Sequence, residues 1–126
     1  MRSLLGNTRK NDITIYGNGR IDISAHVSRL LGLNRGDVID LMDTGSEYYL
    51  YIKYHAPTIG RHEAMCFPTK AGGRHFRTYS FRLCNALMKV FGCNDNKMGL
   101  VIGEPMALFH IDVALPIINR KNDTGN

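Results

Sequence analysis

The stretch that decides the fold is GRIDISAHVSRLLGLNRGDVIDLMDTGSEYYLYIKY, which runs from Gly19 to Tyr54. Residues 20–23 alternate apolar and charged side chains, a pattern typical of a strand with one buried face. Ser24 is suited to cap a helix over residues 25–31, because its hydroxyl can accept a backbone N–H of the first turn. Gly32 can adopt the left-handed conformation that ends a helix. We therefore expect a strand followed at once by a short capped helix.

Two more strands are expected after this helix, over residues 38–42 and 48–54, joined by a Thr-Gly-Ser turn. Upstream, residues 12–16 alternate like a strand and are joined to the next strand by a Gly-Asn-Gly turn. The elements together predict a ββαββ unit that spans residues 12–55.

The same order of elements recurs in the second half of the chain and predicts a second unit over residues 63–115. Its expected parts are a strand at 64–67, a strand at 74–79, a Ser80 cap, a helix at 81–91, a Gly92 stop and a hairpin of 99–102 with 107–113. We expect a single domain over residues 12–118 built of these two similar units. Residues 1–11 are predicted to form a flexible arm, and residues 119–126 a frayed tail.

The composition favours a polyanionic partner. The 126 residues include 16 Lys and Arg against 11 Asp and Glu, a formal net charge of +5. An excess of base is typical of nucleic-acid-binding proteins, although it also serves solubility. Three cysteines without a Cys-x-x-Cys spacing indicate reduced thiols. We see no signal peptide and no apolar run long enough for a membrane span, so we expect a cytoplasmic protein without membrane contact.

Three short motifs carry a resemblance to a known family. Gly19-Arg20-Ile21-x-Ile23, a helix that ends Leu31-Gly32-Leu33, and Gly36-Asp37-x-Ile39-x-Leu41 follow one another without gaps. This arrangement, over residues 11–54, resembles the AbrB/SpoVT/MraZ-like swapped-hairpin family. Ser24 stands where the family usually has proline. Of the basic residues that members of the family carry, only Arg20 and Arg29 have counterparts here.

The resemblance implies a mainly β fold with two short helices (α+β), a swapped-hairpin or double-psi-like β-barrel. In the family, two chains usually interlock because one unit cannot bury its own apolar face. Here the second copy can supply the partner within one chain, as an intrachain pseudo-dimer of two ββαββ units. A homodimer and an appended second module stay open as alternatives.

The function implied is that of a DNA-binding protein, a transcriptional regulator of the AbrB-like type or an antitoxin. Its partners would be double-stranded DNA and, for an antitoxin, a toxin-like protein. Guanidinium groups suit phosphate and the guanine edge. The candidate DNA-binding residues are Arg9, Lys10, Arg20, Arg29, Arg35, Arg74, Arg77, Arg82 and Lys89.

The alternative is a protein- or ligand-binding module with the same fold and no DNA activity. It would present the tyrosine-rich strand, with Tyr49 and Tyr51, and the segment 56–73 to a partner. Cross-strand packing of these tyrosines is the simpler interpretation. Cys66 near His62 could pair as nucleophile and base only if the fold brought them together. We find no catalytic constellation, metal-ligand spacing or phosphate-binding loop, and expect neither enzymatic activity nor a cofactor.

Overall fold

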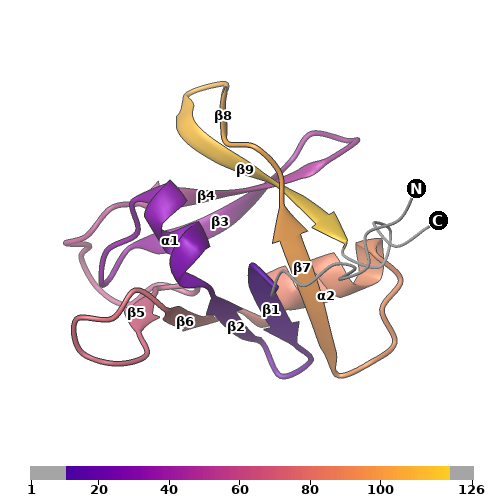
Figure 1. The fold of residues 1–126 in the computed structure, drawn as a ribbon, viewed down its shortest axis with the longest axis horizontal. Coiled ribbons are helices and arrows are strands. Elements are labelled where there is room, and N and C mark those ends of the chain that lie inside the picture. The colour runs from indigo at the N-terminus through magenta and orange to yellow at the C-terminus, as the bar shows by residue number, and fades with distance from the viewer. Residues whose placement is uncertain (1–10, 120–126) are drawn as a thin grey trace, which may run out of the picture.

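The structure is a computed structural model, and it describes residues 11–119. In chain order the elements are β1 (Ile13–Tyr16), β2 (Arg20–Ile23), α1 (Ala25–Leu31), β3 (Val38–Asp43), β4 (Tyr48–Tyr54), β5 (Phe67–Pro68), β6 (Phe76–Tyr79), α2 (Phe81–Val90), β7 (Lys97–Ile102), β8 (Met106–Leu108) and β9 (Ile111–Asn119). The fold is mainly β with two helices, as the sequence predicts (Figure 1). Neither helix has the length and apolar character needed to cross a membrane.

The strands between residues 11 and 119 form one curled antiparallel sheet, a half-barrel. Their order is β3-β4-β9-β7-β1-β2-β6-β5, with β8 attached to β9. The residues just ahead of β5 also reach β3 at the other end of this order. Val38 and Met65 form an isolated antiparallel bridge, and the backbone N–H of Ile39 donates to the carbonyl of Ala64 at 3.1 Å. Both ends of the sheet are therefore joined through the segment 64–66.

The two halves of the chain are interleaved in this sheet. Strand β1 pairs with β7, which places Ile13 opposite Leu100. Strand β2 pairs with β6, and β4 pairs with β9. A fourth contact between the halves joins the segment 64–66 of the second half to β3 of the first. Each half therefore supplies strands that complete the sheet of the other.

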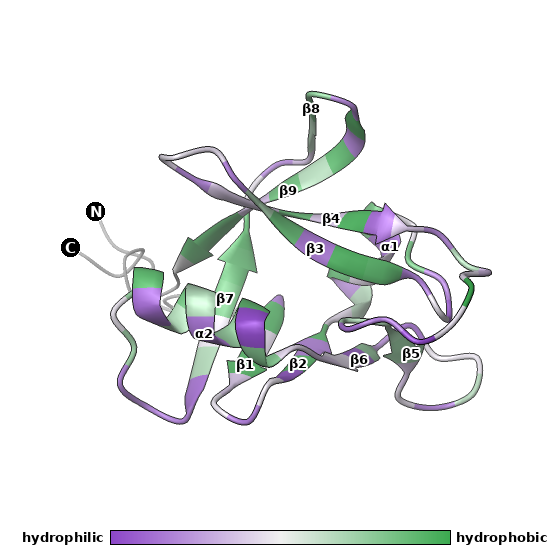
Figure 2. Ribbon diagram, turned by 180° about the vertical axis from the view of Figure 1, so that it is seen from behind, coloured by the Kyte–Doolittle hydropathy of each residue, from purple (hydrophilic) through white to green (hydrophobic). Residues whose placement is uncertain are grey.

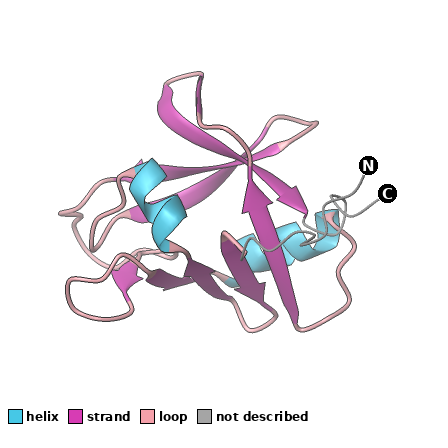
Figure 3. Cartoon of the chain, viewed as in Figure 1, coloured by secondary structure: helices cyan, strands magenta, loops and turns pink. Residues whose placement is uncertain are grey.

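The two helices begin as predicted. The Ser24 hydroxyl accepts the backbone N–H of Val27 at 3.3 Å, and the Ser80 hydroxyl accepts that of Leu83 at 3.1 Å. At the end of α1, Gly32 has φ 69°, the expected left-handed stop. In the second half, α2 ends at Val90, one residue earlier than expected. The two helices lie apart, α1 beside β3 and β4 and α2 behind β7 and β1 (Figure 3).

Helix α2 covers the inner face of the sheet at β7 and β1. Seen from behind, it lies over β7 and β1 (Figure 2). Its Cys84 and Leu87 join a core in which the largest fully buried side chains include Ile15, Ile23 and Phe76. Burial of each such apolar side chain contributes roughly 1.5–3 kcal/mol. Because α2 occupies the inner face, the side chains on the opposite face of β7, β1, β2 and β6 point away from the core.

A glycine fixes the start of β2. Gly19 has φ 96°, a conformation that L side chains rarely adopt. A Cβ there would also lie 3.1 Å from the backbone nitrogen of Phe81, at the first turn of α2. The β1–β2 turn can therefore pack directly against the start of α2.

The second hairpin differs from the prediction. We expected residues 99–102 to pair with 107–113, but β7 pairs with β9, and Ile102 lies opposite Ile117. Residues 106–108 form β8, which folds back on β9 through a turn in which Phe109 has φ 55°. Strand β9 extends to residue 119 because its apolar side chains continue past 113, and Pro116 is tolerated within it. The expected strand at 64–67 is only the two-residue β5.

Candidate nucleic-acid interface

The outer face of β7, β1, β2 and β6 carries a row of basic and aromatic side chains. Residues directly opposite each other in antiparallel strands point to the same side of the sheet. Tyr16 lies opposite Lys97, Arg20 opposite Tyr79, and Asp22 opposite Arg77. Their neighbours in sequence, such as Ile15 and Ile21, are buried on the inner face. We call this outward set, Tyr16, Arg20, Asp22, Arg77, Tyr79 and Lys97, the basic face.

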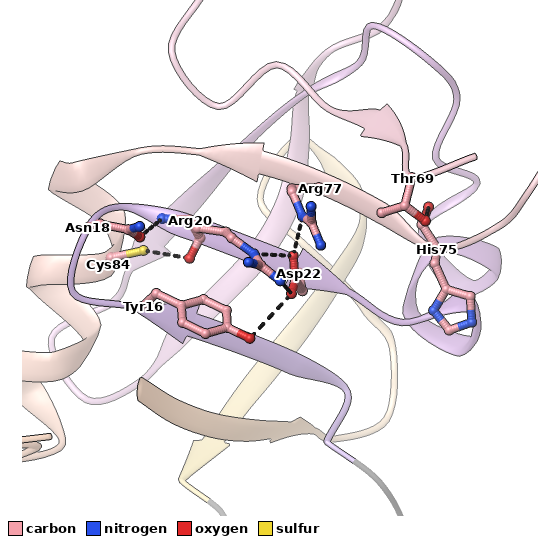
Figure 4. A network of polar contacts seen from close by, with 8 residues as sticks. All are labelled: Tyr16, Asn18, Arg20, Asp22, Thr69, His75, Arg77 and Cys84. Atoms are coloured by element: carbon pink, nitrogen blue, oxygen red, sulfur yellow. Dashed lines mark hydrogen bonds and ion pairs between the residues drawn. The ribbon is translucent and has the colours of Figure 1, made fainter. Parts of the chain in front are cut away.

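Asp22 stands at the centre of the basic face and holds two arginines (Figure 4). The Arg20 Nη2 lies 2.7 Å from Asp22 Oδ2 and its Nε 3.1 Å from Oδ1, a bidentate pair. From the neighbouring strand, Arg77 Nε donates to the same Oδ1 at 2.8 Å. The Tyr16 hydroxyl points to Asp22 Oδ2 at 3.4 Å. One carboxylate therefore positions guanidinium groups from both halves of the chain.

The charge state of Asp22 follows from these contacts. Partial burial by itself would raise the pKa of Asp22, but the hydrogen bonds from Arg20 and Arg77 outweigh it and lower that pKa below its ordinary value. The pKa of Arg20 is raised, chiefly by its hydrogen bond to Asp22. All three side chains stay partly exposed. At neutral pH the network is therefore an ionised, net positive cluster that is open to solvent.

Two cations of the basic face lie beside the ring of Tyr16. The guanidinium carbon of Arg20 lies 4.5 Å from the ring centroid of Tyr16, and Lys97 Nζ lies 5.8 Å from the same centroid. Such stacking holds a long side chain in place while its charge remains accessible. The aromatic residue thus orders two cations from neighbouring strands.

The face continues from β6 onto β5. Phe67 lies opposite Arg77 in the β5–β6 pair, and the guanidinium of Arg35 lies 5.4 Å from its ring. A groove of about 590 Å³ lies beside it, with Phe67, Arg77, Tyr79 and Arg61 among its lining residues. Phe67 and Tyr79 are 42% and 57% exposed, so both rings are available at this surface.

Of the predicted DNA-binding residues, the structure brings Arg20 and Arg77 together and places Arg35 on the adjoining part of the same face. Arg74 is engaged elsewhere, because its Nη2 donates to the Ser28 carbonyl of α1 at 3.2 Å. Arg29 lies exposed on α1 and is not part of this cluster. Arg9 and Lys10 lie outside the described residues.

The two predicted residues of the second helix lie apart from the basic face. Arg82 forms a bidentate pair with Glu63 Oε1 at 2.8 and 3.0 Å, and Ser80 donates to the same carboxylate. These hydrogen bonds, with that of Arg82 the largest cause, lower the pKa of Glu63. Lys89 is exposed in the last turn of α2. Arg82 therefore holds an acidic residue near the start of α2.

Sequence reasoning did not single out Tyr16, Tyr79, Lys97 or Phe67 as site residues. The available signal was the two-residue period of the strands, which puts Tyr16 and Arg20 on the faces opposite Ile15 and Ile21. The register that aligns Lys97 with Tyr16 joins residues about eighty positions apart. A local sequence pattern cannot predict a pairing between residues so far apart in the chain.

Two hypothetical sites of the sequence analysis are not supported by the geometry. Tyr49 is buried against Ile111 and Ala114 of β9, which confirms cross-strand packing for that ring. Cys66 is also buried, and burial raises the pKa of its thiol to about 12. A neutral core thiol of this kind cannot serve as a nucleophile. Within residues 11–119, no three His, Cys, Asp or Glu side chains gather as a metal site.

Comparison of the chain with models of protein families gives no match, and neither curated proteins nor solved structures match it. The resemblance to the AbrB-like family therefore remains a prediction from the motifs of residues 11–54.

Proposed function

We propose that this protein binds DNA through the basic face, as a transcriptional regulator or antitoxin of the AbrB-like type would. The observation that carries the proposal is the convergence of cations on one outward surface: Arg20 and Arg77 around Asp22, Lys97 beside Tyr16, and Arg35 beside Phe67 on the extension onto β5. A surface of this composition attracts phosphates, and binding releases the counterions that surround the nucleic acid.

The arrangement of the cations supports a polyanion rather than solubility alone. Solvated surface charges are normally dispersed, whereas Asp22 and Tyr16 here hold guanidinium groups in fixed positions. Arg20 and Arg77 keep N–H groups that Asp22 does not engage, since each guanidinium carries five. These groups can donate to phosphate oxygens without breaking the network.

We also propose that the sheet is an intrachain pseudo-dimer of two swapped units. The support is reciprocal pairing: β1 with β7 of the second half, and the segment 64–66 with β3 of the first. Strand β2 pairs with β6, its counterpart in the other unit. Arg20 and Arg77 come from these two strands, so the site would lie at the junction of the units.

The proposal is tested by fluorescence anisotropy of a labelled mixed-sequence DNA duplex at increasing salt. We expect binding at low salt that weakens linearly on a log–log plot. The double variant Arg20→Gln/Arg77→Gln should lose most of the affinity, and Lys89→Gln, which removes one charge from α2, should lose little. Absence of binding at low salt, or equal losses in both variants, contradicts the proposal.

A second candidate, a protein-binding module that uses Tyr49 and Tyr51, has less support. Tyr49 is buried, and the Tyr51 hydroxyl lies 3.4 Å from Asp40 Oδ2 in the neighbouring strand. These contacts assign both rings to the packing of the sheet rather than to a partner.

A further inference from the structure

The basic face and its extension onto β5 carry exposed aromatic rings that duplex binding does not explain. Tyr79 and Phe67 remain about half exposed although they lie among charged side chains. A duplex presents phosphates and the edges of its bases, while the flat faces of the bases are stacked inside. Rings on a sheet surface have no partner in such a complex. Unpaired bases, in contrast, stack on exposed aromatic side chains.

The two rings occupy neighbouring positions on one surface. Phe67 of β5 lies opposite Arg77 of β6, and Tyr79 is two residues after Arg77 on β6. All three side chains therefore point outward. Diagonal neighbours of this kind have backbones roughly 7–8 Å apart. The groove of about 590 Å³ beside them is also lined by Met65 and Arg61. A cavity of this size is large enough for a flat heterocycle.

Cations accompany the rings. Arg35 lies 5.4 Å from the ring of Phe67, and Arg20 is paired with Tyr79 across β2 and β6. Arg77 lies opposite Phe67 and two residues from Tyr79 on β6. A positively charged surface that tracks the backbone, with rings on which bases stack, is the combination used for single strands.

We infer that the basic face and its extension onto β5 bind single-stranded DNA more tightly than duplex DNA, with bases stacked on Tyr79 and Phe67 and phosphates held by Arg20, Arg35 and Arg77. This inference rests on the proposed function and names the form of DNA that the site takes. Stacking is tolerant of base identity because every base has a flat face. The site would therefore hold unpaired segments with little sequence preference.

The test compares a labelled single strand of about 16 nucleotides, within the range of known single-strand sites, with the duplex formed by its complement. The full chain is titrated at matched salt, with Tyr79→Thr and Phe67→Thr as variants, because threonine preserves the strand preference. Tyr79→Leu keeps apolar bulk without a ring. The matched control is Phe109→Asn, which removes an exposed ring from the β8–β9 turn, where asparagine suits the positive φ.

We expect the single strand to bind more tightly than the duplex. Each loss of a ring at Tyr79 or Phe67 should weaken single-strand binding about tenfold, including in Tyr79→Leu, with the salt slope unchanged. Phe109→Asn should bind like the wild-type protein. Equal or tighter binding of the duplex, with no effect of the ring variants, overturns the inference and leaves the proposed function intact. Absence of binding to either form rejects both.

Discussion

Replacement of Arg77 by glutamine should lower the salt dependence of DNA binding by one phosphate contact. Four cations, Arg20, Arg35, Arg77 and Lys97, lie on the basic face and its extension onto β5. Each phosphate neutralised on duplex DNA contributes about −0.9 to the slope of log K against log salt. If all four reach phosphates, the slope is about −3.6, and if Asp22 keeps one cation engaged it is about −2.7.

These slopes correspond to large changes in affinity. Between about 50 and 200 mM salt, a slope of −3.6 weakens binding about 150-fold and a slope of −2.7 about 40-fold. The change expected for Arg77→Gln is a slope less steep by about 0.9, because Arg77 keeps N–H groups for phosphate that Asp22 does not engage. On single strands the corresponding change is about 0.7. The difference between variant and wild-type protein is therefore more diagnostic than either slope alone.

The assay is anisotropy of a labelled oligonucleotide at several salt concentrations, with Lys89→Gln as the control for loss of one charge. Thermal unfolding of both variants checks that the fold is retained. Because Arg77 and Asp22 are partly exposed, loss of their ion pair should cost only about 0–1 kcal/mol. An unchanged slope in Arg77→Gln, or an equal change in Lys89→Gln, refutes the assignment of the basic face.

Four further predictions concern the network, the fold and the thiols. Asp22→Asn should bind DNA more tightly, measured by the same titration, because it adds one net positive charge; weaker binding would mean that positioning of Arg20 and Arg77 outweighs that charge. Because the pKa of Asp22 is lowered in the folded state, its ionised carboxylate stabilises the fold above the unfolded-state pKa, and this stabilisation is lost as pH falls through the folded-state pKa. The free energy of unfolding, measured with urea at several acid pH values, should therefore fall less with pH in Asp22→Asn than in the wild-type protein. Gly19→Ala should destabilise by about 1–3 kcal/mol in urea unfolding, more than Gly45→Ala, which has a similar φ of 93° and no neighbour within 4 Å; equal losses would exclude a role for the contact with Phe81. In the native protein only Cys93 should react with a thiol reagent at neutral pH, since Cys66 and Cys84 are buried with raised pKa values, and rapid reaction of more than one thiol would contradict that burial.

Local features of the fold were predictable because they depend on a few neighbouring residues. The alternation of residues 20–23, the Ser24 and Ser80 caps and the Gly32 stop each follow from short-range physics, and the structure confirms them. Asp37, which directly precedes the expected strand at 38–42, accepts backbone N–H groups from Asn34 and Ala56 at 2.7 Å. In that position it orders the turn ahead of β3.

Features that depend on pairing between distant strands were not predictable. The expected strand of residues 107–113 is too short because distant pairing extends β9: the carbonyl of Pro116 accepts the N–H of Gly103, and Leu115 lies opposite Leu50 of β4. Only part of the candidate site was predicted, because its residues too are brought together by the pairing of distant strands. Basic residues can be counted in a sequence, but the register that joins Arg77 to Asp22, and so separates both from Arg29, arises only on folding.

The pairing of strands between the two halves has a consequence for how the chain comes apart. If β1 is withdrawn, β7 loses a hydrogen-bonded neighbour, and if the segment 64–66 is withdrawn, β3 loses one. Neither half retains a complete sheet when the other unfolds, so backbone amides in both halves should exchange with solvent in a single concerted opening. A cut in the connection over residues 56–62 would produce two fragments that regain structure only by finding each other.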